Sequence, residues 1–242
     1  MGYTDWHCHL LPQLDDGAGD PEEALAMARA LASAGFSRVV CTPHFLPGGY
    51  ANTPDGVRDA TTSLQSLLRR EGVELELHAA GEYYLDEFLH LRLAEPLAAP
   101  GRRLLAEFPP HLGAQLLPRL VDAVSSKGIV PLIAHPERNP LLAPPERRRG
   151  LLARFLAKEE SPVLEQLRER GCLFQGNIGS FAGLYGEKVR SRALALLEEG
   201  WYDCLGSDAH RSRGLERWLN EGLAAVERVA GSEGLRRLLV VP

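Results

Sequence analysis

Short apolar or alternating runs take turns with longer amphipathic stretches along almost the whole chain. Side chains alternate in a strand and recur about every 3.6 residues in a helix, so the two patterns predict different elements. Strands are expected at residues 3–9, 37–44, 73–84, 103–109, 129–137, 172–180 and 202–210. Helices are expected at residues 21–36, 53–72, 85–93, 112–128, 186–200 and 213–238, and in two pieces within residues 140–171.

Two of these helical stretches carry more specific expectations. Residues 53–72 are expected to be helical in their second half, and residues 140–171 to break near Ser161 and Pro162. The overall alternation of strands and helices implies parallel strands joined by helical crossovers. This pattern leaves two α/β architectures open, a doubly wound sheet and a closed barrel. No linker-like segment or internal repeat divides the chain, so a single domain over residues 1–242 is expected.

Composition and charge narrow the classes of function. The formal net charge is −5, which does not favour a nucleic-acid surface. No apolar run approaches the roughly 20 residues of a membrane span, and the N-terminus does not resemble a signal peptide, so no membrane insertion is expected. The four cysteines form no C-x-x-C pair, which indicates a cytoplasmic protein with free thiols.

Side chains that can bind metals collect where the predicted strands end. The carboxyl ends of parallel strands lie on one face of the fold, so these side chains are expected to meet there. A lone histidine at a strand end often has a purely structural role, but here strands at very different spacings all supply nitrogen or oxygen ligands. The candidates are His7, His9, His44, Glu82, Glu107, His135, Asp208 and His210.

Strand alternation separates the ligands from their neighbours. His7 and His9 are two residues apart and project to the same side, as do Asp208 and His210, whereas Cys8 projects away. Imidazole and carboxylate groups without a thiolate suit zinc, manganese or iron. One catalytic ion needs about three protein ligands. A set of this size therefore predicts two or three divalent ions.

The ordered segments DWHCHLLPQLDDG, CTPH, GEYY, AEF, IAHPER and GSDAH resemble the PHP superfamily (polymerase and histidinol phosphatase). Within it, they are most similar to the bacterial protein-tyrosine phosphatases of capsule and exopolysaccharide systems. The resemblance extends from Asp5 to about Arg213. It implies a distorted, TIM-like (β/α)7 barrel with a trinuclear metal centre, with manganese as the first choice of metal and iron or zinc as alternatives.

The resemblance also implies which residues bind each ion. Glu82 would bridge the first two ions and so take part in catalysis. Asp15 competes with Asp16 for the third ion, and the family pattern of two aspartates before a glycine favours Asp16. The implied ligands are His7, His9, Glu82 and Asp208 for the first ion, Glu82, Glu107 and His135 for the second, and Asp16, His44 and His210 for the third.

Two arginines are implied as catalytic contacts to phosphate. Arg138 in AHPER occupies the position of a phosphate-binding arginine in the family, and Arg213 is the candidate for a second one. The segment around Arg213 departs from the usual family pattern, so Arg211 competes with it.

The implied activity is a metal-dependent phosphoric-monoester hydrolase, a protein-tyrosine phosphatase that uses a metal-activated hydroxide. Its substrate would be a phosphotyrosine protein, in the family the cytoplasmic tail of a tyrosine autokinase, and a homo-oligomer is left open. A histidinol-phosphate phosphatase or other PHP phosphoesterase is the alternative, although that branch tends to carry histidine in place of Glu107. A binding module without activity would be expected to lack some ligands. Cys8 lacks the C-x5-R loop of cysteine-based tyrosine phosphatases and is expected to be a packed thiol.

Overall fold

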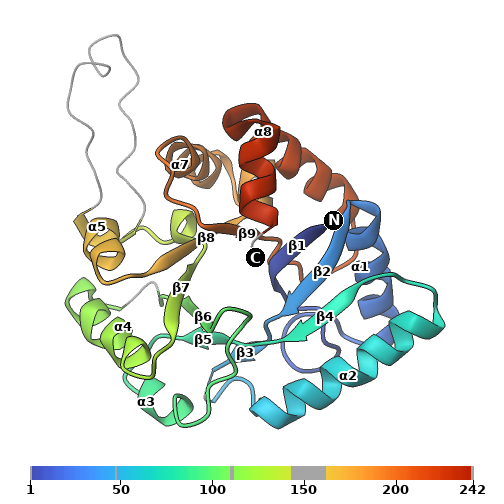
Figure 1. Cartoon of the computed structure of the whole chain (residues 1–242), viewed down its shortest axis with the longest axis horizontal. Helices are drawn as coiled ribbons and strands as arrows, with labels where there is room; N and C mark the ends of the chain where they lie inside the picture. Colours follow the sequence, from blue (N-terminus) through green and yellow to red (C-terminus); the bar gives the residue numbers. More distant parts are fainter. Residues whose placement is uncertain (1, 47, 110–111, 143–161, 241–242) are drawn as a thin grey trace.

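The computed structural model describes residues 2–46, 48–109, 112–142 and 162–240, where nine short strands lie inside a ring of helices (Figure 1). The strands are β1 (Tyr3–Cys8), β2 (Phe36–Cys41), β3 (His44–Phe45), β4 (Glu76–Ala79), β5 (Glu82–Tyr84), β6 (Arg103–Glu107), β7 (Val130–Ala134), β8 (Leu173–Asn177) and β9 (Cys204–Gly206). The α-helices are α1 (Pro21–Ser33), α2 (Pro54–Arg70), α3 (Leu89–Arg92), α4 (Leu117–Ser125), α5 (Pro162–Glu169), α6 (Ile178–Ala182), α7 (Glu187–Glu198) and α8 (Leu215–Leu239). Two 3₁₀ turns, η1 (Ala114–Leu116) and η2 (Pro136–Arg138), follow β6 and β7. None of these helices within the described residues is both long and apolar enough to cross a membrane.

The parallel strands occupy seven positions of a distorted barrel. One sheet has the order β1-β2-β4 and the other the order β3-β5-β6-β7-β8-β9. Hydrogen bonds from Ala80 N–H to the Cys41 carbonyl (2.9 Å) and from Glu82 N–H to the Pro43 carbonyl (3.1 Å) carry one sheet into the other. β3 and β5 therefore prolong β2 and β4 in the same two positions.

The ring closes between β1 and β9. Asp208 N–H donates to the His7 carbonyl (2.7 Å), and His9 N–H donates to the Ala209 carbonyl (3.1 Å). Cys8 and Ala209 form a parallel bridge between these donors. Of the two architectures that the sequence pattern left open, the structure has the barrel, which confirms the fold implied by the family resemblance.

Two predicted strands are each divided in two, which corrects their expected ends. The prediction for 37–44 becomes β2 and β3, and that for 73–84 becomes β4 and β5, so His44 and Glu82 begin strands instead of ending them. Pro43 lacks the N–H that an uninterrupted ladder would need. Gly81, on the neighbouring strand, leaves space that the ring of Phe45 fills.

Other boundaries also differ from the expectation. Helix α2 begins at Pro54, not halfway through residues 53–72, because the Thr53 hydroxyl caps the N–H of Gly56 at 3.2 Å. The strand expected over 172–180 ends at Asn177, whose side chain caps α6 by accepting from Gly179 N–H. Helix α5 matches the second piece expected within 140–171, while residues 143–161, with the first piece, lie outside the described residues.

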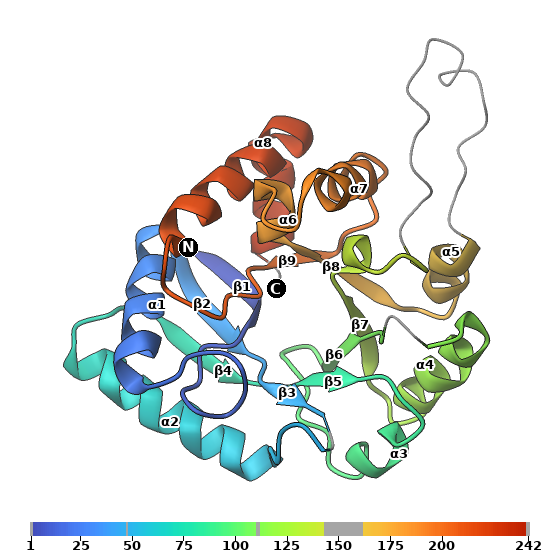
Figure 2. The same cartoon turned by 180° about the vertical axis from the view of Figure 1, so that it is seen from behind.

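Apolar side chains fill the interior of the barrel. Trp6, Val40, Leu105 and Leu132 form a buried cluster inside it, separate from the larger core between strands and helices. Polar side chains gather near the carboxyl ends of the strands. Figure 2 shows the dark-blue loop between β1 and α1 in front of the strands.

Candidate metal centre

All nine side chains expected to bind metal lie together where the strands of the barrel end. They form four overlapping groups, and within each group the potential ligand atoms all lie within 4.8 Å of one another. The groups are His7, His9 and Glu82; His7, His135 and Asp208; His44, Glu82 and Glu107; and His9, Asp16, His44 and His210.

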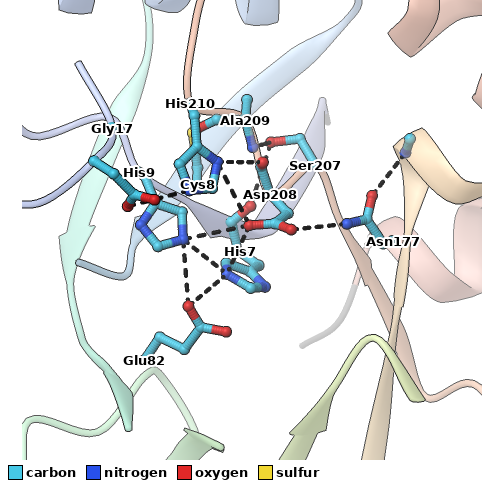
Figure 3. Close-up of polar contacts among 12 residues, drawn as sticks. His7, Cys8, His9, Gly17, Glu82, Asn177, Ser207, Asp208, Ala209 and His210 are labelled. Carbon is cyan, nitrogen blue, oxygen red and sulfur yellow. Dashed lines mark hydrogen bonds and ion pairs between the residues drawn. The ribbon is translucent and has the colours of Figure 1, made fainter. Parts of the chain in front are cut away.

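The innermost atoms belong to His7, His9, Glu82 and Asp208, all of which are buried. The two imidazole Nε2 atoms are 3.1 Å apart. Each lies 3.3–3.4 Å from Glu82 Oε2 and 3.3 Å from Asp208 Oδ1 (Figure 3). A tetrahedron with ligand distances of about 2.1 Å has edges of about 3.4 Å. The spacings among His7, His9 and Glu82 therefore fit three ligands of one small cation, whereas Glu82 and Asp208 do not occur together in any of the four groups.

Hydrogen bonds on the far side of both imidazoles assign their tautomers. His7 Nδ1 lies 3.0 Å from the Gln175 side-chain oxygen, whose amide nitrogen donates to the Gly176 carbonyl (2.6 Å). His9 Nδ1 lies 2.6 Å from the Asp15 carboxylate. Both Nδ1 atoms therefore donate, and both Nε2 lone pairs face the two inner carboxylates. Four lone-pair-bearing groups facing one another require positive charge among them.

The electrostatics of the centre show the same requirement. Burial opposes a charge on His7, yet Glu82 and Asp208 outweigh it and raise the pKa of His7 to about 9. Burial likewise opposes the Glu82 carboxylate, but His7, His135 and His44 hold its pKa well below the usual range. Glu82 Oε1 is buried with no hydrogen-bond partner. A divalent cation can replace the protons that the imidazoles would otherwise hold.

Glu82 also faces two of the three candidate histidines outside the innermost group. Its Oε2 lies 3.1 Å from His44 Nδ1, and its Oε1 lies 3.4 Å from His135 Nε2. Glu107 Oε1 lies 3.8 Å from the same His135 nitrogen. His135 and Asp208 have φ angles of 31° and 54°, a left-handed conformation that costs about 1–3 kcal/mol in residues other than glycine. These two residues lie at turns whose conformation directs their side chains toward the centre.

The two aspartates of the first loop have different contacts. Asp15 is directed to His9 Nδ1 and also accepts from the backbone N–H of His44 (3.1 Å). Asp16 is half-exposed, and its Oδ1 lies 3.5 Å from His44 Nε2 and 3.4 Å from His210 Nε2. Asp15 therefore orients an imidazole, whereas Asp16 faces the open side of the two outer histidines.

Asp5 and Ser207 join the two ligand-bearing segments, although the sequence pattern did not single them out. Asp5 accepts from the backbone N–H groups of Ser207 (2.7 Å) and His7 (3.2 Å), and the Ser207 hydroxyl donates to its second oxygen (2.5 Å). Burial raises the pKa of Asp5 to about 6. A Cβ on Gly206 would lie 2.5 Å from the His7 Cβ, so glycine allows this close approach. Asp5, Ser207 and Gln175 are polar residues inside predicted strands, and that position was the signal in the sequence that could have identified them.

Arg138 lies at the edge of the centre. Its guanidinium donates to Asp208 Oδ2, which also accepts from the Asn177 amide at 2.9 Å. Figure 3 shows Asn177 approaching Asp208 from the side opposite the histidines. The other carboxylate oxygen of Asp208 is thus directed toward His7 and His9.

The other two arginine candidates lie in the segment after β9. Arg211 donates to the backbone carbonyls of Asp16 (2.7 Å) and Gly17, which ties this segment to the aspartate loop. Arg213 is exposed, and its side chain has no hydrogen bond or ion pair within the described part of the chain.

Cys8 lies beside the ligands but faces away from them. Its thiol is fully buried and approaches the Ala209 carbonyl at 3.7 Å. Burial raises the pKa of this thiol well above its usual value. A protonated, enclosed thiol does not act as a nucleophile.

Comparison with known proteins finds relatives that match nearly the whole chain. A family model described as capsular polysaccharide synthesis, CpsB/CapC, matches residues 3–241. The tyrosine-protein phosphatase YwqE of Bacillus subtilis (strain 168) is 32% identical over 232 residues, which are 95% of this chain and 85% of that protein. A solved structure from work on YwqE and Streptococcus pneumoniae CpsB, described as unique metal-dependent tyrosine phosphatases, has a TM-score of 0.83 and 32% identity, covering 97% of this chain and 90% of its own.

A more distant structure shows the fold alone. Histidinol phosphate phosphatase from Lactococcus lactis has a TM-score of 0.61 and 12% identity, with 94% of each chain covered. The family model spans nearly the whole chain, and the resemblance to the tyrosine-phosphatase branch of the PHP superfamily is confirmed. This chain belongs to the capsular polysaccharide synthesis family CpsB/CapC.

Proposed function

We propose that this chain is a metal-dependent protein-tyrosine phosphatase. The observation that carries the proposal is the innermost group, in which the two imidazole Nε2 atoms lie 3.1 Å apart and each lies 3.3–3.4 Å from both Glu82 and Asp208. The similarity to YwqE, a tyrosine-protein phosphatase, supports the same activity.

The nine clustered side chains would hold two or three divalent ions, with manganese as the first choice and iron or zinc as alternatives. Such ions lower the pKa of a coordinated water and neutralise phosphoryl oxygens. Glu82 would be shared between ions, since its two oxygens face different histidines. The proposed ligands are His7, His9, Asp16, His44, Glu82, Glu107, His135, Asp208 and His210.

The arginines would bind the phosphate. One N–H group of the Arg138 guanidinium donates to Asp208. Its other N–H groups would donate to phosphate oxygens. Arg213 is exposed and is proposed as the second contact. Asn177 would keep Asp208 directed toward the histidines while Arg138 engages the substrate. A phenolate leaves readily, so little help from a general acid is needed.

The proposed substrate is a phosphotyrosine protein, specifically the cytoplasmic tail of a tyrosine autokinase, which would place the enzyme in the cytoplasm. The family's role in capsular polysaccharide synthesis supports this choice. Histidinol phosphate is the competing substrate, because the enzyme that hydrolyses it shares the fold. Kinetics on both esters side by side would separate the two activities.

Removing the metal tests the proposed function. Treatment with a chelator is expected to lower hydrolysis of p-nitrophenyl phosphate and of a phosphotyrosine peptide by at least about a hundredfold, and added Mn²⁺ to restore it. Circular dichroism before and after treatment controls for unfolding. Full activity in protein shown to be metal-free would exclude this function.

Asp16→Ala is expected to remove one ion per chain and leave the others bound. Asp16 contacts only the outer histidines His44 and His210 among the proposed ligands, while Glu82 and Asp208 hold the inner group. Metal content measured by mass spectrometry checks this division. Asp20→Ala is the matched control, because Asp20 lies in the same loop and caps α1. Equal loss of all ions in Asp16→Ala would contradict separate positions.

A further inference from the structure

Two tyrosines outside the proposed ligand set lie across the mouth of the barrel from each other. Tyr50 follows β3, and Tyr185 follows α6, directly after β8. Around the barrel, β3 and β8 are separated by β1 and β9 on one side and by β5, β6 and β7 on the other. The proposed metal ligands lie on or near β3 and on the strands and loops between β3 and β8.

Tyr50 packs against one of the outer histidines. Its ring is nearly parallel to the His44 imidazole, with an interplanar angle of 9° and centroids 5.7 Å apart. Tyr50 N–H donates to the Leu46 carbonyl (2.9 Å), and the Asn52 amide donates to the carbonyls of His44 (2.9 Å) and Leu14 (3.0 Å). This loop therefore holds the ring at the proposed third ion.

Tyr185 packs against the proposed phosphate-binding arginine. The Arg138 guanidinium lies 4.4 Å from the centre of the Tyr185 ring. The Tyr185 hydroxyl lies 3.4 Å from the Asn177 amide, which also holds Asp208. Although it is large and aromatic, Tyr185 is 38% exposed. An exposed ring fixed beside a phosphate-binding group offers a surface to whatever carries the phosphate.

In a phosphotyrosine ester, the aryl ring lies one oxygen away from phosphorus. If Arg138 and ions bound by the proposed ligands hold the phosphate, that ring would project into the mouth of the barrel. We propose that Tyr50 and Tyr185 contact the aryl ring from opposite sides and select aromatic over aliphatic phosphate esters. This inference rests on the proposed function and adds the residues that set its specificity. A packed aromatic pair favours binding by about two- to twelve-fold.

The test compares two phosphonates that differ only in the ring, benzylphosphonate and methylphosphonate. Their dissociation constants are measured by calorimetry on the full, manganese-loaded chain, which requires no turnover. Wild type is expected to prefer benzylphosphonate. Tyr50→Leu and Tyr185→Leu should each lower this preference by about two- to twelve-fold, with methylphosphonate affinity nearly unchanged. The Tyr50→Phe and Tyr185→Phe variants should retain it.

A matched control is Tyr3→Leu, because Tyr3 packs on Phe36 at the start of β1, far from the ligand-bearing strand ends. An unchanged preference in both leucine variants would overturn the proposal. Equal weakening of both phosphonates would also overturn it, since the rings would then only support the site. Failure of the proposed function has a different signature, namely wild type that binds metal but hydrolyses no phosphate monoester.

Discussion

Glu82→Gln is expected to lower hydrolysis of a phosphotyrosine peptide by at least about a thousandfold and to release metal from the chain. Glu82 approaches four imidazoles, those of His7, His9, His44 and His135, at 3.1–3.4 Å. Glutamine keeps the volume of the side chain but removes its charge. Its amide hydrogens would also point at nitrogen atoms that need their lone pairs for metal.

The measurements for this variant are steady-state kinetics, metal content and the thermal unfolding midpoint. Glu137→Gln is the matched control, because Glu137 is equally buried but accepts from the Asn177 N–H (3.0 Å) and the Tyr202 hydroxyl (3.0 Å). The control should lower the unfolding midpoint while metal remains bound. Normal metal content and turnover in Glu82→Gln would remove Glu82 from the centre.

Arg138→Lys is expected to lower kcat/KM by about a hundredfold without loss of metal. A lysine ammonium is a single point charge, so it cannot hold Asp208 and also present a planar fork to the phosphate. The Asn177 amide, 2.9 Å from Asp208, should keep that carboxylate in place. The substitution should therefore weaken phosphate binding and leave the metal content unchanged.

The comparison for Arg138→Lys is Arg29→Lys, a surface arginine paired with Glu71 at 3.1 Å, which should leave the kinetics unchanged. Loss of metal in Arg138→Lys would instead assign Arg138 the role of holding Asp208.

Arg213→Ala is expected to raise KM more than it lowers kcat, since its exposed side chain has to reach the substrate.

The local pattern of the sequence was sufficient for several features. Alternation along a strand predicted that His7 and His9 converge and that Cys8 turns away, as the structure shows. The alternation of strands with helices predicted parallel strands, all of whose carboxyl ends lie on one face. These features depend on residues near one another in the chain.

The interrupted strands show where local pattern was insufficient. Pro43 lies between β2 and β3, and Gly81 lies between β4 and β5. The two breaks fall side by side, so β3 and β5 continue the sheet together. From the sequence alone, Pro43 or Gly81 could equally have marked a bend within one continuous strand. Only the pairing of β2 with β4, and of β3 with β5, makes Glu82 the first residue of a strand that faces four histidines.

The sequence by itself predicted the candidate metal ligands and most of the strand ends near which they lie, although His44 and Glu82 begin strands. The tertiary structure decided the separate tasks of Asp15 and Asp16, the support of His7 by Gln175, and the packing of Tyr185 on Arg138. These contacts join loops and strands far apart in the chain. Their geometry depends on which strands become neighbours, and residue type or spacing along the sequence does not encode that directly.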